Sequence, residues 1–181
     1  SDALASRLLA MAPQNASGTT CVSKGGATGG AAANMDCQWA WVREAAQRLA
    51  AAKIADQPLL SSFDALLDYC RIHVSHARIE EFHILFLDTK NRLVKHERQG
   101  VGTVDQAPVY VREVLRRALE LGASNIIMLH NHPSGDPTPS RADIAITNRV
   151  VEAGQPLGVK VHDHLIIGKS GHVSLKSRGL I

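Results

Sequence analysis

The chain has 181 residues, of which 45% are hydrophobic and 20% charged, with a formal net charge of +3. These values are typical of a globular domain that can bury an ordinary core. No apolar run reaches the roughly 20 residues that span a bilayer. No block of Lys and Arg forms a stripe, so the composition supports nucleic-acid binding only weakly.

Cysteine usage indicates a reducing compartment. Cys21, Cys37 and Cys70 are odd in number and irregularly spaced, unlike a disulfide framework, although Cys21 and Cys37 could pair. The first residues also lack the basic region and apolar core of a signal peptide. We therefore expect a cytoplasmic protein with no membrane partner.

The N-terminal part of the chain, residues 1–57, gives weak structural signals. Residues 12–36 are rich in Gly, Ala, Ser and Thr and show neither a helical nor a strand period, which is typical of a linker. A short helix is expected over residues 2–10 and a stronger one over 39–53. The main domain is expected over residues 58–181.

The first half of that domain is predicted to contain a helix followed by strands. Ser61 or Ser62 can cap a helix with apolar residues at helical spacing. The apolar run 82–88 is typical of a buried strand. Further strands are expected at 92–97 and around 100–105.

The second half alternates helices and strands. Pro108 can open a helix that Gly122 closes, followed by a buried strand over 124–130. A helix over 140–155 and a strand over 159–168 complete the pattern. This alternation predicts an α/β fold in which a mixed β-sheet is flanked by helices.

Two histidines lie at the exit of the strand over 124–130. Residues i and i+2 of a strand project from the same face, so His130 and His132 can converge on one point. Strand ends in α/β sheets are common ligand sites, and a catalytic zinc ion typically takes three protein ligands. Asp143, in the first turn of the next helix, could supply the third.

The same residues fit a helix cap. Ser140 and Asp143 stand at the N-cap and N3 positions of a capping box, and Pro137 and Pro139 would stop any helix before them. Capping alone does not explain a His-x-His pair immediately upstream. The two interpretations are compatible, because a capping carboxylate has a second oxygen for a metal.

The segment "HNHPSGDPTPSRAD" reads His-x-His, seven residues, Ser, two residues, Asp. This spacing resembles the metal signature of the JAB1/MPN (JAMM) zinc metallopeptidase family. Together with "RRALELGAS" and "VHDHLIIG", it resembles the RadC-like branch of that family over residues 58–181. The resemblance implies a JAB1/MPN-like fold with cytidine-deaminase-like layering. It also implies Zn²⁺ held by His130, His132 and Asp143, with Ser140 donating to the oxyanion.

The resemblance also implies a glutamate that acts as general base before an early strand. Glu80 and Glu81 are available, and the position relative to the apolar run favours Glu81. The choice depends on register, since neighbouring strand residues point to opposite faces. Zinc would lower the pKa of its water and polarise a carbonyl, and the glutamate would move the proton during cleavage of a peptide or isopeptide bond.

Other features leave alternatives open. His162 and His164 could support the zinc ligands by hydrogen bonds, although such histidines are more often structural. The rival function is a DNA-repair-associated DNA- or protein-binding module with an unused metal site. Residues 1–57 lack the complete helix-hairpin-helix segment usual in the RadC-like branch, which weakens the case for DNA. The sequence identifies neither the peptide or protein substrate nor whether the chain forms a homodimer.

Overall fold

A computed structural model describes residues 31–54, 58–101 and 109–181. The chain divides into one unit up to Ala50 and a second unit from Ala51 onward. Helix α2, Ala31–Ile54, contains the predicted helix over 39–53 but begins earlier. The linker prediction is therefore wrong for residues 31–36, where consecutive alanines favour a helix. The helix expected over 2–10 and the remainder of the linker lie outside the described residues.

The second unit contains the elements that form the sheet and its covering helices. A short 3₁₀ helix, Leu59–Ser61, precedes the first of them, and another, Gln155–Leu157, follows the last helix. In chain order the elements are α3 (Phe63–Val74), β1 (Glu81–Leu87), β2 (Leu93–Val101), α4 (Val111–Glu120), β3 (Asn125–Asn131), α5 (Arg141–Gly154), β4 (Lys160–Gly168) and β5 (Gly171–Ser174).

The five strands form one mixed sheet in the order β2-β1-β3-β4-β5. Strand β1 is antiparallel to both β2 and β3, β3 is parallel to β4, and β4 is antiparallel to β5. Helix α5 makes the connection between the parallel strands β3 and β4, as such a crossover requires. The predicted α/β fold with a mixed sheet flanked by helices is confirmed.

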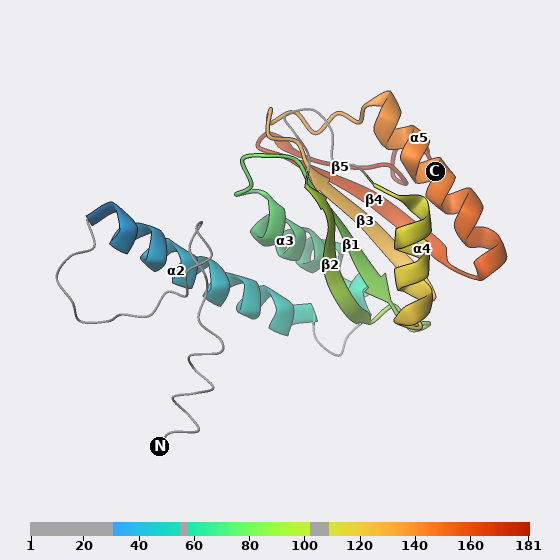
Figure 1. The fold of residues 1–181 in the computed structure, drawn as a ribbon, viewed down its shortest axis with the longest axis horizontal. Coiled ribbons are helices and arrows are strands. Elements are labelled where there is room, and N and C mark those ends of the chain that lie inside the picture. The colour runs from blue at the N-terminus through green and yellow to red at the C-terminus, as the bar shows by residue number, and fades with distance from the viewer. Residues whose placement is uncertain (1–30, 55–57, 102–108) are drawn as a thin grey trace, which may run out of the picture. The chain divides into compact units, whose positions relative to one another are not determined.

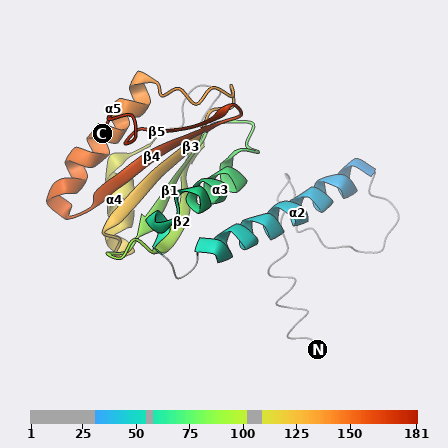
Figure 2. The same ribbon diagram turned by 180° about the vertical axis from the view of Figure 1, so that it is seen from behind.

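Helices cover both faces of the sheet (Figures 1 and 2). Helices α4 and α5 lie on one face and α3 lies on the other. The core under α4 and α5 takes alternate residues of the central strands, among them Phe82, Ile84, Met128 and Ile126. Residues between these on β1 point toward the α3 face. This alternation decides which polar side chains can meet at the end of β3.

Local signals account for most element boundaries. Ser62 caps α3, its side chain accepting a hydrogen bond from Ala65 N. The two strands expected at 92–97 and around 100–105 are one strand as far as Val101, and residues 102–105 lie outside the described part. Strand β5 was not predicted, because four residues are too few to show a period. Over the described ranges, each helix is too short or too polar to cross a bilayer.

Candidate metal centre

His130 lies near the end of β3, fully buried under the α4 and α5 layer. It pairs with Phe82 across the β1–β3 ladder, so both side chains are on the same face of the sheet. The Phe82 ring stacks on the imidazole, with ring centroids 5.7 Å apart. The ring of His130 is therefore held between packed neighbours, with its Nε2 atom toward the end of the strand.

His132 follows β3 and remains tied to the sheet. Its backbone N–H donates to Ile167 O over 2.8 Å, which extends the contact with β4 by one residue. Its Nδ1 lies 2.8 Å from the carbonyl oxygen of Asp136, which can only accept. Nδ1 therefore bears the proton and Nε2 is left with a lone pair. That Nε2 atom lies 2.9 Å from Nε2 of His130.

Asp143 reaches the same point from the first turn of α5. Ser140 Oγ accepts from Asp143 N, and Asp143 Oδ2 accepts from Ser140 N, so the predicted capping box is present. Asp143 Oδ1 lies 3.4 Å from Nε2 of His130, and Oδ2 lies 3.7 Å from Nε2 of His132. The carboxylate caps the helix while one oxygen faces the buried histidine.

The donor atoms suit a zinc ion. One atom each from His130, His132 and Asp143 lies within 4.8 Å of the others. Two imidazole nitrogens and a carboxylate oxygen form the three-ligand set that leaves one position open on a catalytic zinc. The three residues come from two elements that meet only in the folded chain. The residues present therefore fit the metal that the motif implies.

The protonation states also suit a metal. Burial lowers the pKa of His130 to about 4, so its imidazole is neutral near pH 7. Burial opposes ionisation of Asp143, but the bonds and charges from His132, His130 and Ser140 outweigh it and hold the pKa of the carboxyl well below its usual range. The Asp143 carboxylate raises the pKa of His132. A metal binds neutral imidazoles and an ionised carboxylate, which are the forms that His130 and Asp143 already hold, and its binding would displace any proton from Nε2 of His132.

A chain of hydrogen bonds fixes the tautomer of His130. Thr147 Oγ1 lies 2.5 Å from the carbonyl oxygen of Asp143, so its single proton points there. The same oxygen lies 2.6 Å from Nδ1 of His164 and must accept from it. Nε2 of His164 then accepts from Nδ1–H of His130 over 2.8 Å, which leaves Nε2 of His130 free for a metal.

The two histidines proposed to support the ligands thus differ. His164 is fully buried and contacts His130, as its position on β4 suggested. His162 instead lies 2.6 Å from Oδ1 of Asn91, and its side chain is not among those that meet at the metal centre. His162 falls between the pairs Ile126–Val161 and Ile127–Asp163, where the β3–β4 register shifts, so the regular two-residue alternation does not carry over from His164 to His162.

The structure places Glu81, the residue favoured as general base, away from the three metal donors. Phe82 faces the α4 and α5 layer with His130, so Glu81 beside it points to the other face. There its carboxylate lies 3.0 Å from Arg98 Nη1 and 3.2 Å from His83 Nε2. Glu80 immediately precedes β1, and its carboxylate contributes to raising the pKa of His132. The structure does not bring Glu81 to the metal centre.

Two side chains that hold parts of the candidate site in place were not predicted from the sequence. Asn131, between the two histidines, accepts from Glu81 N over 2.8 Å and donates to Ile79 O over 3.0 Å. Its amide therefore holds the backbone on both sides of Glu80. The other is Thr147, described above, which lies mid-helix without a local signature. The sequence offered a signal for Asn131 alone, because a polar residue between two histidines is unusual at the end of an apolar strand.

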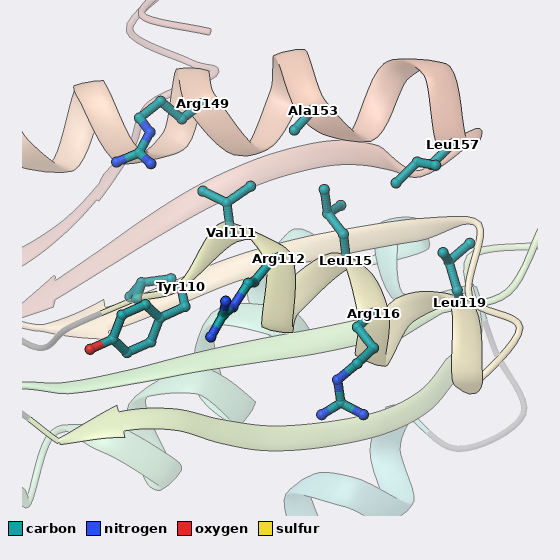
Figure 3. A pocket seen from close by; sticks show the side chains of 10 residues that line it. Tyr110, Val111, Arg112, Leu115, Arg116, Leu119, Arg149, Ala153 and Leu157 are labelled. Carbon is teal, nitrogen blue, oxygen red and sulfur yellow. The ribbon is translucent and has the colours of Figure 1, made fainter.

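An apolar groove with a volume of about 1020 Å³ lies between α4 and α5. Figure 3 shows Val111 and Leu115 of α4 opposite Ala153 of α5, with Leu157 toward one end. Arg149 extends from α5 over the other end of the groove. None of the proposed metal donors lines this groove, so it is a separate surface feature.

The fold and the donor set define an α/β domain with a metal-binding arrangement at the end of a sheet strand. Residues 60–180 match the family of the RadC-like JAB domain, and the chain belongs to this family. It is 54% identical over 140 residues to a UPF0758 protein of Rhodobacter capsulatus, covering 77% of this chain and 65% of that protein. It is 52% identical over 136 residues to a UPF0758 protein of Ruegeria pomeroyi, covering 75% and 61%. The chain spans less than two thirds of the length of these relatives.

Proposed function

We propose that this chain is a zinc-dependent hydrolase of the JAMM type that cleaves a peptide or isopeptide bond. The observation that supports the proposal most is the convergence of His130, His132 and Asp143, with the charge of Glu80 acting on His132. A bound Zn²⁺ would polarise the scissile carbonyl and lower the pKa of water. The remaining chemistry belongs to side chains of this chain.

Glu80 is the general base in this proposal. Its carboxylate accepts a proton from the attacking water and returns it to the amine nitrogen as the C–N bond breaks. The water oxygen ends on the carbonyl carbon, so the products are a carboxylate and an amine. The hydrogen bonds of Asn131 to Ile79 O and Glu81 N position the Glu80 backbone for this transfer.

Ser140 supplies a hydrogen bond to the oxygen on which charge develops. One lone pair of its Oγ accepts from Asp143 N, and the hydroxyl proton remains available to donate. Losing one such donor raises the activation barrier by about 2.7–4 kcal/mol. The capping bond fixes the oxygen position, so one side chain serves both the helix and the reaction.

The neighbouring glutamates provide a matched test. In zinc-loaded protein assayed on a library of fluorescence-quenched peptides and isopeptides, Glu80→Gln should lower kcat by about 10²- to 10⁴-fold while retaining zinc. Glu81→Gln, one residue away on the opposite face, should change kcat less than about threefold, because general-base catalysis does not involve it. Equal losses in both variants would contradict the assignment of Glu80. No turnover by the zinc-loaded parent would favour the alternative binding module.

A further inference from the structure

The segment that follows His132 is folded against the turn between β4 and β5. Gly135 N donates to His132 O over 3.0 Å, closing a tight turn, and Gly135 has φ of +98°, a conformation that favours glycine. The next residue, Asp136, provides the carbonyl oxygen that accepts from Nδ1 of His132. The orientation of this proposed ligand thus depends on where residues 135 and 136 lie.

The β4–β5 turn determines that position by two hydrogen bonds. Ser170 N and Ser170 Oγ both donate to Gly135 O, over 3.1 and 2.9 Å. Two donors on one carbonyl fix its direction as well as its distance. Residue 170 is separated from residue 135 by the whole of α5 and β4, so this is a tertiary contact.

Close packing against Gly168 at the end of β4 also fixes residues 135–137. A Cβ atom on Gly168 would overlap the carbonyl oxygen of Gly135 and lie 2.9 Å from Pro137 N. Both atoms belong to backbone, which cannot move aside as a flexible side chain can. Glycine at 168 therefore allows the segment to lie directly on the end of β4.

We infer that the β4–β5 turn positions the metal ligand His132, with Ser170 as the positioning residue, acting through Gly135 and the carbonyl of Asp136. A ligand imidazole needs its second nitrogen held by a fixed acceptor. Loss of such support typically lowers metal affinity by about 10- to 100-fold. The inference rests on the proposed metal centre but concerns a turn outside the motif.

The test measures zinc affinity by competition with a chromophoric chelator and records the Co²⁺ absorption spectrum of each variant of the full chain. Ser170→Ala should bind Zn²⁺ about tenfold more weakly and alter the Co²⁺ spectrum, whereas Ser170→Thr, which keeps the hydroxyl, should match the parent. Ser61→Ala is the matched control, because its hydroxyl also donates to a backbone carbonyl, that of Pro58, over 2.7 Å. Gly168→Ala should weaken binding further.

The inference would be overturned if Ser170→Ala bound Zn²⁺ within twofold of both the parent and Ser61→Ala, a difference of about 0.4 kcal/mol or less. An equal loss in Ser170→Thr would also contradict it, since that variant retains the donor. A parent that takes up no zinc would instead refute the proposed function, so the two failures are distinguishable. Because Ser170 is an exposed residue and Ser170→Ala removes only its hydroxyl, the result for this variant does not depend on whether Gly168→Ala folds.

Discussion

Each proposed histidine ligand is held by an acceptor that fixes which nitrogen faces the metal. His132 donates to a backbone carbonyl, and His130 donates to His164, which in turn donates to Thr147. The final proton of this chain ends on the carbonyl of Asp143, within the helix that supplies the carboxylate ligand. The first turns of α5 therefore support two of the three proposed ligands, one directly and one through this chain.

Thr147→Val tests this chain at the level of one atom. The substitution keeps the shape of the side chain but removes the hydroxyl that accepts from Nδ1 of His164, so His164 can adopt the tautomer that disfavours His130 Nε2 as a ligand. We expect Zn²⁺ affinity to fall about 10- to 100-fold in chelator competition. Thr89→Val, at an exposed turn, is the control and should match the parent. Unchanged affinity in Thr147→Val would show that the chain does not support the ligand.

At this scale the sequence predicted the three donors and one of their supports, His164, but not Thr147 or the face on which each glutamate lies. His130 and His132 lie at the end of a strand and Asp143 lies at the start of a helix, and local sequence patterns predict both positions. The choice between Glu80 and Glu81 depends on the register of β1 against β3, and no local pattern reports register. Thr147 meets His164 only after α5 packs on β4, so its role could not be read from neighbours in sequence.

Helix α3 meets the opposite face of the sheet through a second polar chain. Glu81 accepts from His83 Nε2, His83 Nδ1 accepts from His96 Nε2, and His96 Nδ1 accepts from the hydroxyl of Tyr69 on α3. This direction follows because the carboxylate can only accept and each neutral imidazole donates once. Glu81 is thus part of a hydrogen-bond chain that joins β1 and β2 to α3.

The hydrogen-bond chain from Glu81 to Tyr69 predicts that the folded protein loses stability in acid. Burial lowers the pKa of His96 to about 3, below the 6.5 expected in the unfolded chain. The unfolded state therefore binds a proton that the folded state does not, so this contribution is complete above about pH 6.5 and decreases as pH falls toward 3. In metal-free protein, His96→Gln should make the decline in the free energy of unfolding shallower by up to about 1.4 kcal/mol per pH unit.

Urea unfolding at a series of pH values between 7 and 4 measures this slope. A slope in His96→Gln equal to that of the parent would contradict the burial of a neutral imidazole at this position. The variant is expected to be less stable at pH 7, because the Tyr69 hydroxyl and His83 lose a partner. The test therefore compares slopes and not absolute stabilities.

At the scale of the whole molecule, the sheet provides the common frame of both polar chains. The central strands β1 and β3 are mostly apolar, and Met128, next to His164 across the ladder, is fully buried beneath α4 and α5. Met128→Ala should lower the free energy of unfolding by about 2–5 kcal/mol in urea denaturation, because it leaves a cavity under the metal centre. Val94→Ala on the edge strand, 43% exposed, should cost less than about 1 kcal/mol. Similar losses in the two variants would contradict this view of the core.

How well each strand was predicted from sequence depends on whether it lies in the centre or at the edge of the sheet. The central strands were predicted from sequence because both faces of the sheet are covered, which gives the short apolar runs of β1, of β3 and of the second half of β4. The edge strands β2 and β5 were divided or missed, since β2 is polar along much of its length and β5 is short. Helix α2 begins within a segment whose glycines and alanines together suggested a linker, although the alanines alone favour helix.

The most direct test of the central claim is the zinc content of the full chain, purified without chelator or added metal and measured by plasma mass spectrometry. We expect about one zinc per chain in the parent and in His162→Ala, whose side chain contacts Asn91 instead of the ligands. In His132→Ala and Asp143→Ala the zinc should be lost, because each removes a donor from the three-ligand set. A parent that contains no zinc and takes up none when it is supplied, or ligand variants that retain as much as the parent, would contradict the proposed metal centre.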